Sequence, residues 1–232
     1  MSKPVDEHSL RLARTTLVLS RLEARYGIPH WFPRLDPLDE LIACILSQNT
    51  SDTNSFRAYE SLKRTYPNWT DVLAVPAVEL ADTIRSGGLA DSKAPRIQAV
   101  LRVILEQRRE LTLDFLENQT DAEARAWLMA LPGVGPKTAG IVLCFAMGRP
   151  VLPVDTHVFR VAWRLGLIEK KIGEFKAHDA LQEQIRPEQT YRFHVALITH
   201  GRQVCKALAP RCHDCPLTDL CRYYAEQSRE LE

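Results

Sequence analysis

LPGVGPKTA, residues 131–139, is the stretch of this 232-residue chain that most strongly indicates its fold. It lies between an amphipathic segment that ends near residue 130 and an apolar segment over residues 138–147, and both have helical spacing. Two glycines around a valine allow a tight turn with free backbone amides, and a helix begins directly after it. The stretch therefore predicts two helices joined by a turn that can seat an anion, such as a DNA phosphate. An ordinary helix–helix turn with a glycine cap is the simpler alternative.

Lys137 lies in the first turn of the helix that follows this hairpin. A cation there faces the positive end of the helix dipole, which disfavours the ammonium form. We expect partial desolvation to add to this effect and to leave a neutral amine that can attack a sugar carbon and form a Schiff base. A solvated lysine that contacts a phosphate is the alternative.

The segment LPVDTHVFR, residues 152–160, places Asp155 just before the next helical stretch. An aspartate there is expected to cap the helix by accepting hydrogen bonds from its free amides. The same fixed carboxylate could stabilise positive charge on a deoxyribose as its base departs. His157 and Arg160 are candidates to approach DNA, although single residues of these types serve equally well in packing or at the surface.

Four cysteines are close together near the end of the chain, as Cys205-x6-Cys212-x2-Cys215-x5-Cys221. Structural zinc sites present their ligands as two close pairs, and only one such pair is present here. Unequal spacing favours an iron–sulfur cluster, whose ligands are farther apart than those of one ion. Zinc binding and incidental thiols are the alternatives that the spacing leaves open.

Composition and periodicity indicate a folded, all-α protein. The chain is 45% apolar with only 10 glycines, which excludes a disordered or fibrous class. Apolar residues recur at helical spacing, no alternating run suggests a strand, and Asp36-Pro37 is a good helix opening. The formal net charge is +1, but residues 137–211 contain 12 Lys and Arg against 6 Asp and Glu, so the basic excess lies in the second half.

The amino-terminal stretch lacks the apolar core of a signal peptide, and no run of about 18 apolar residues would span a membrane. We therefore expect a soluble, cytoplasmic protein without a membrane partner. Thiols are kept reduced in that compartment, so six cysteines favour metal binding or burial over disulfides.

The order and spacing of the hairpin with its lysine, the Val-Asp-Thr-His segment and the four cysteines resemble the endonuclease III branch of the helix-hairpin-helix DNA glycosylases. The resemblance covers residues 30–225 or so. It implies an all-α helix-hairpin-helix glycosylase fold with two helical domains flanking a DNA-binding cleft. These would be a six-helix barrel over residues 30–149 and a discontinuous cluster domain from residues 1–29 and 150–232.

The resemblance also implies roles for particular residues. Lys137 matches the nucleophile, Asp155 matches the aspartate that stabilises charge or activates the lysine, and the four cysteines match the ligands of a 4Fe-4S cluster. In the segment ILSQNTSD, residues 45–52, Gln48 or Asn49 would fill the gap left by a flipped nucleotide, and Leu89 would press against the orphaned base. The DNA-binding candidates are Gln48, Asn49, Leu89, Gly133, Val134, Gly135, Thr138 and His157.

The implied function is that of a bacterial base-excision repair enzyme, a DNA glycosylase with AP β-lyase activity. It would act as a monomer on duplex DNA that contains damaged pyrimidines or abasic sites. Met129 stands where many members have glutamate, so the recognition pocket is expected to be less polar. Pro136 replaces a common basic residue, which removes one possible phosphate contact.

Two other functions stay open from the sequence. One is a mismatch-specific glycosylase for thymine or adenine, although the adenine branch usually has no hairpin lysine and has an added carboxy-terminal domain. This chain ends 11 residues after Cys221, without such a domain. The other is a non-catalytic DNA-binding module, for which the pairing of Lys137 with Asp155 would be unnecessary.

Overall fold

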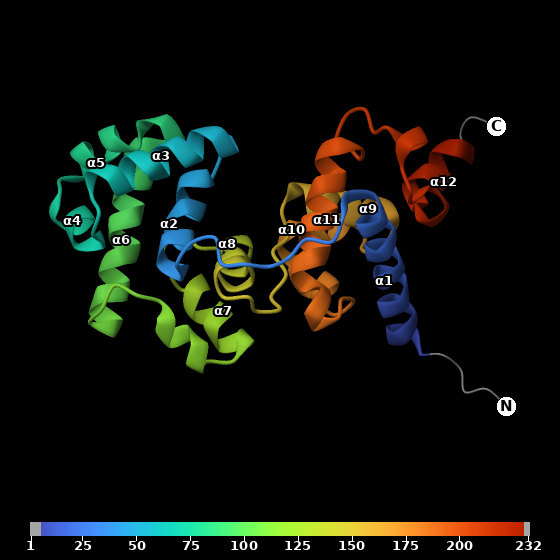
Figure 1. Ribbon diagram of the computed structural model, residues 1–232, viewed down its shortest axis with the longest axis horizontal. Coiled ribbons are helices and arrows are strands. Elements are labelled where there is room, and N and C mark those ends of the chain that lie inside the picture. Colours follow the sequence, from blue (N-terminus) through green and yellow to red (C-terminus); the bar gives the residue numbers. More distant parts are fainter. Residues whose placement is uncertain (1–5, 230–232) are drawn as a thin grey trace. The chain divides into compact units, whose positions relative to one another are not determined.

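The structure is a computed structural model that describes residues 6–229. Over these residues it contains helices and no strand, which confirms the predicted all-α class (Figure 1). No helix in this part of the chain is both long and apolar enough to cross a membrane. The α-helices are α1 (Glu7–Tyr26), α2 (Pro37–Ser47), α3 (Asp52–Thr65), α4 (Trp69–Ala74), α5 (Ala77–Thr83), α6 (Ala90–Arg108), α7 (Asp121–Met129), α8 (Pro136–Ile141), α9 (Thr156–Leu165), α10 (Gly173–Gln182), α11 (Thr190–Gln203) and α12 (Arg222–Arg229).

The chain divides into two compact units. The first unit combines the residues up to Phe32 with those from Gly148 onward, and the second unit runs from Pro33 to Met147. The sequence placed the corresponding boundaries after residues 29 and 149. A six-helix barrel stays a prediction drawn from the resemblance.

Helix α2 runs through the core of the second unit, where it contacts α3, α6 and α8. It begins at Pro37 after Asp36, as the sequence predicts, but the Asp36 side chain makes no capping hydrogen bond. Glu40, in its first turn, is fully buried and forms an ion pair with Arg34. Because the apolar face of α2 is also buried, its C-terminal end at Ser47 is held firmly beside α6 and α8.

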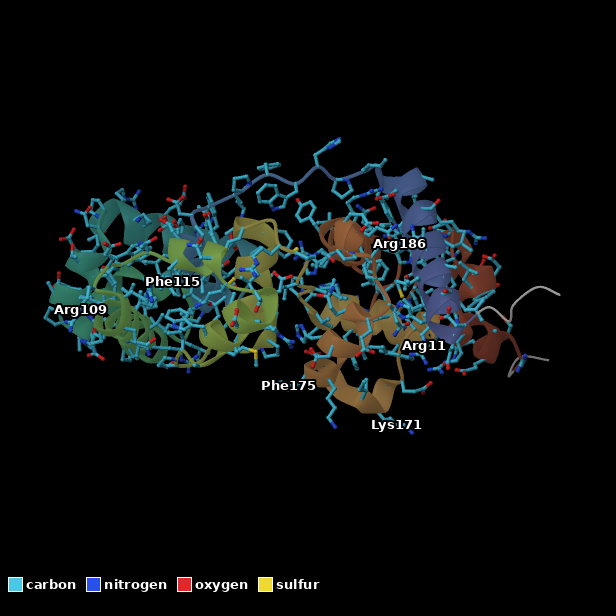
Figure 2. The ribbon with its side chains drawn as sticks, turned by 90° about the horizontal axis from the view of Figure 1, so that it is seen from below. Arg11, Arg109, Phe115, Lys171, Phe175 and Arg186 are labelled. Carbon is cyan, nitrogen blue, oxygen red and sulfur yellow. The ribbon has the colours of Figure 1, made fainter. Side chains whose placement is uncertain are left out.

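A short 3₁₀ segment, η2 (Asp114–Asn118), connects α6 to α7 and contains Phe115 (Figure 2). The Phe115 ring packs edge-on against Trp127 of α7, with ring centroids 4.8 Å apart, and the Arg108 guanidinium lies 4.0 Å from the Phe115 centroid. Thr120 and Glu123 form a reciprocal capping box at the start of α7. These contacts fix α7, which leads directly into the hairpin.

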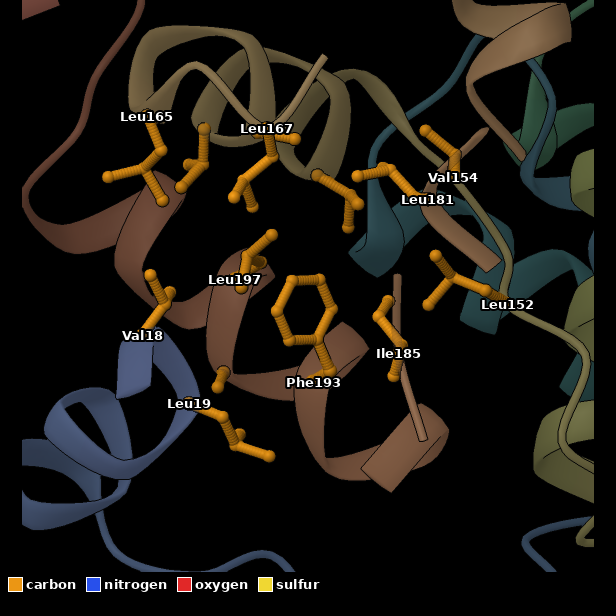
Figure 3. Packing of buried hydrophobic residues seen from close by; sticks show 14 of the residues in the cluster. Val18, Leu19, Leu152, Val154, Leu165, Leu167, Leu181, Ile185, Phe193 and Leu197 are labelled. Atoms are coloured by element: carbon orange, nitrogen blue, oxygen red, sulfur yellow. The ribbon is translucent and has the colours of Figure 1, made fainter. Parts of the chain in front are cut away.

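The core of the first unit brings together helices from both ends of the chain. Phe193 and Leu197 of α11 are buried against Val18 and Leu19 of α1 (Figure 3). Leu165, at the end of α9, belongs to the same cluster. This packing holds α9, which begins after Asp155, beside α11, which leads to the four cysteines.

Candidate functional site

The hairpin between α7 and α8 requires glycine at its first glycine position. Gly133 has φ +73°, in the left-handed region that other residues adopt at a cost. Gly135 is extended and caps α8, and a Cβ added there would meet no atom within 4 Å. The amides of Gly133 and Gly135 donate to no group in the described part of the chain. Two N–H groups are therefore free to bind an anion, as predicted.

Val134 differs from the two glycines around it. Its N–H donates to the carbonyl of Leu131 at 3.1 Å, and its side chain is buried. The expectation that all hairpin amides are free is therefore wrong for this residue. Thr138, another candidate for DNA binding, is also buried.

Lys137 is the second residue of α8, and its side chain is exposed. It forms no hydrogen bond or ion pair with the residues that the structure describes. The expected partial desolvation is therefore wrong for the free protein. Burial raises the pKa of the neighbouring Cys44 thiol on α2, while the charge of Lys137 acts in the opposite direction. The lysine amine is accessible to a substrate.

The loop after α2 contains the two candidates for filling the space of a flipped base. The Gln48 amide is bonded at both ends: its Nε2 donates to the carbonyl of Gly133 at 3.3 Å, and its Oε1 accepts from Nη1 of Arg96 at 2.9 Å. Asn49 is exposed, has φ +54° and makes no hydrogen bond with other described residues. Of the two side chains, that of Asn49 is free to move.

Leu89 lies in the turn just before α6 and is 58% exposed. Its φ of +51° is left-handed, which costs a non-glycine residue about 1–3 kcal/mol. A Cβ added at Gly88 would lie 3.9 Å from Oγ1 of Thr50, so this turn adjoins the Asn49 loop. An exposed leucine in strained backbone is therefore held next to the other candidate loop.

Lys93 is a structural residue of this region that the sequence did not reveal. Its side chain is only 1% exposed, and its Nζ donates to the carbonyls of Leu46 at 2.7 Å and Gly87 at 2.8 Å. Burial lowers its pKa. Lys93 thus joins the end of α2 to the turn that contains Leu89.

Asp155 belongs to the first unit and caps α9. Its Oδ1 accepts a hydrogen bond from the N–H of Val158 at 2.7 Å, which confirms the predicted cap. The carboxylate is half-buried, so its other oxygen can face a ligand.

His157 and Arg160 lie one turn apart on α9 and contact each other. Arg160 Nη2 lies 3.0 Å from Nδ1 of His157 and 2.9 Å from the carbonyl of Gly201. The guanidinium, the imidazole Nδ1 and the Gly201 carbonyl therefore lie within hydrogen-bond distance of one another. Arg160 Nε also donates to the carbonyl of Cys205. Arg160 therefore has a packing role, which was one of its two predicted roles, and it positions the segment that contains Cys205.

The four clustered cysteines all line one small pocket. All six cysteines of the chain are free thiols. Between residues 6 and 229, no three His, Cys, Asp or Glu side chains are placed to hold a single metal ion. Burial raises the pKa of Cys215 to about 11 and also raises that of Cys221.

Two basic side chains contact the sulfurs of this pocket. Arg164 Nη1 donates to Sγ of Cys205 at 3.4 Å, and Nε2 of His200 lies 3.5 Å from Sγ of Cys215. Nδ1 of His200 lies 3.0 Å from the hydroxyl of Tyr26, and burial lowers the His200 pKa to about 4. The sequence did not predict these contacts. The one pattern that could have indicated them is the spacing of Arg160 and Arg164, which are four residues apart and so lie on one face of α9.

The chain is similar to known proteins in both sequence and structure. Residues 42–187 match the protein family described as "HhH-GPD superfamily base excision DNA repair protein". Endonuclease III of Bacillus subtilis is 38% identical over 188 residues, which cover 81% of each chain. A protein of Arabidopsis thaliana, provisionally named a DNA glycosylase, is 38% identical. The match covers 78% of this chain and 64% of the length of the Arabidopsis protein. The structure of a trapped endonuclease III–DNA covalent intermediate is 33% identical, with a TM-score of 0.79 over 94% of this chain and 99% of that chain.

The capping role of Asp155 can be measured separately from any chemistry. Asp155→Ala removes the acceptor of the Val158 N–H and should lower the free energy of unfolding by about 1 kcal/mol. Asp155→Asn keeps a good capping group and should lower it by less than half as much. Urea denaturation of both variants checks this, and equal losses would contradict the capping role.

Proposed function

The chain belongs to the HhH-GPD superfamily of base excision DNA repair proteins, and from this we propose that it is a bifunctional DNA glycosylase and AP lyase in which Lys137 is the nucleophile. The observation that carries the assignment is the exposed, unpaired Lys137 amine directly after a hairpin with two free glycine amides. A lysine with only a structural role would have a partner or a packed environment.

The substrate that these groups suit is duplex DNA with a damaged pyrimidine or an abasic site. The free amides of Gly133 and Gly135 would bind a backbone phosphate and set the position of the duplex. The damaged nucleotide would rotate out of the stack, which costs least where the base pair is already weakened.

Asn49 and Leu89 are the residues we assign to the space that the flipped nucleotide leaves. Asn49 is exposed and unbonded, whereas the Gln48 amide is held at both ends. Leu89 is an exposed apolar side chain in a strained turn, as expected for a wedge that presses against the orphaned base. We therefore assign the gap to Asn49 rather than to Gln48, the other candidate from the sequence.

Catalysis would begin with attack of the Lys137 Nζ on the sugar C1′. The bond from C1′ to the base nitrogen breaks, and the base leaves with the electron pair and takes up a proton. The ionised Asp155 would stabilise the positive charge that develops on the sugar. Loss of one amine proton and opening of the sugar ring, in which O4′ takes up a proton, give a protonated Schiff base. Removal of a C2′ proton then forms a C2′–C3′ double bond, and the C3′–O bond breaks as the phosphate leaves with the electron pair.

A 4Fe-4S cluster held by Cys205, Cys212, Cys215 and Cys221 is part of the proposal. The four thiols line one pocket, as the ligands of a single cluster must. When bound, the cluster would cross-link the segment from Cys205 to Cys221. We also propose that the protein acts as a cytoplasmic monomer on DNA.

Borohydride trapping tests the nucleophile. The wild-type chain, incubated with a thymine-glycol duplex and borohydride, should give a covalent protein–DNA adduct, and Lys137→Ala should give none. Lys176→Ala, at another exposed lysine, is the matched control and should trap normally. An adduct that persists in Lys137→Ala would refute the assignment, whereas adenine or thymine release from mismatches alone would favour the mismatch alternative.

The charge of Asp155 should matter for the rate more than for folding. Asp155→Asn is expected to slow single-turnover base release by about 100-fold or more, since one electrostatic contact to the transition state is lost. Retention of the wild-type rate would show that Asp155 only caps α9.

Metal analysis tests the cluster. The purified protein should contain about four iron atoms and four acid-labile sulfides per chain, and Cys212→Ser should lose most of both. Cys44→Ser, at a cysteine outside the pocket, should keep them. One zinc ion without sulfide would support the zinc alternative instead.

A further inference from the structure

Arg96 of α6 connects two loops that the proposed mechanism uses. Its Nη1 donates to Oε1 of Gln48 at 2.9 Å, and Nε2 of Gln48 donates to the carbonyl of Gly133 at 3.3 Å. Arg96 and Gln48 are both half-buried. A charged donor makes the stronger kind of hydrogen bond, so the Gln48 amide is held in one orientation.

The Arg96 side chain also lies directly against the hairpin. A Cβ added at Gly133 would lie 2.6 Å from Cδ and 2.8 Å from Nε of Arg96. The positive φ requires glycine at 133, and any side chain there would also force Arg96 to shift. The aliphatic part of Arg96 supports the turn whose free amides face outward.

Arg96 lies one helical turn after Lys93, which binds the carbonyls of Leu46 and Gly87. The two side chains therefore leave α6 on the same face, and they bind Leu46 and Gln48 at the end of α2. Lys93 fixes the backbone at the end of α2, and Arg96 fixes the side chain that follows it.

We propose that Arg96 is a positioning residue for base flipping, which acts through Gln48. By holding the Gln48 amide on the Gly133 carbonyl, it sets the hairpin and the Asn49 loop in their working arrangement before DNA binds. Gln48 is thereby kept out of the gap, and Asn49 is left to enter it. This inference rests on the proposed function, since it assigns a task within the glycosylase reaction.

The competing role for Arg96 is a direct contact with a DNA phosphate. The two roles differ in their dependence on salt, because each phosphate contact releases counterions and changes the slope of log K against log salt by about 0.9. A residue that acts through Gln48 leaves this slope unchanged and alters the rate at saturation.

A double-mutant cycle tests the proposal. Arg96→Met keeps the aliphatic packing but removes the donors, and Gln48→Ala removes the acceptor. Each change should slow single-turnover base release at saturating enzyme by about tenfold, and the double variant should be no slower than either single variant. Rate losses that multiply to about 100-fold would overturn the proposal.

DNA binding is the second measurement. Arg96→Met should change the dissociation constant by less than about twofold and leave the salt slope as in the wild type. Arg102→Met, an exposed arginine on the same helix, is the control for loss of one charge and should leave the release rate unchanged. A salt slope reduced by about one unit in Arg96→Met alone would overturn the proposal in favour of the phosphate contact.

Amide hydrogen exchange tests the contact without any activity. The Val134 N–H, which bonds to Leu131, should exchange at least about threefold faster in Arg96→Met and Gln48→Ala than in the wild type or Arg102→Met. Unchanged exchange would overturn the proposal even if the enzyme is active. Faster exchange in a protein that releases no base from any damaged duplex would refute the proposed function and retain the structural link.

Discussion

A buried ammonium group organises the face of the second unit that we assign to DNA. Lys93 places its charge between the carbonyls of Leu46 and Gly87, so it meets the negative end of α2 and the turn before α6 at once. Burial is unfavourable for a cation that lacks such acceptors. If the two backbone segments moved apart, Lys93 would lose its acceptors while its side chain was still buried. The Asn49 and Leu89 loops follow directly after the two segments that Lys93 joins.

Asp155 combines a capping role with the chemistry that we propose for it. Asp155 is fixed by the amide that it satisfies, and this fixed orientation is what an electrostatic role requires. Lys137, the second residue of α8, is exposed and has no such partner. Residues at helix starts are placed by short-range hydrogen bonds, so their geometry depends little on distant packing.

The sequence predicted the features that depend on contacts between nearby residues, and it did not predict those that depend on distant residues. The helix at Pro37, the cap at Asp155 and the left-handed turn at Gly133 follow from residues within a few positions of one another. Lys93 and Arg96 could not be assigned in this way, because their acceptors lie 47 and 48 residues earlier, and no local pattern distinguishes a buried lysine from a solvated one. The same holds for Tyr26 and His200, which are 174 residues apart.

The discontinuity of the first unit has a consequence for how the chain is made. Helix α1 leaves the ribosome early, but Phe193 and Leu197, which cover its apolar face, are among the later residues to emerge. At about 5–20 residues per second, synthesis of the intervening segment from Pro33 to Met147 takes on the order of ten seconds. During that time the middle of the protein can complete its own core, while α1 presents Val18 and Leu19 to solvent and to any chaperone nearby.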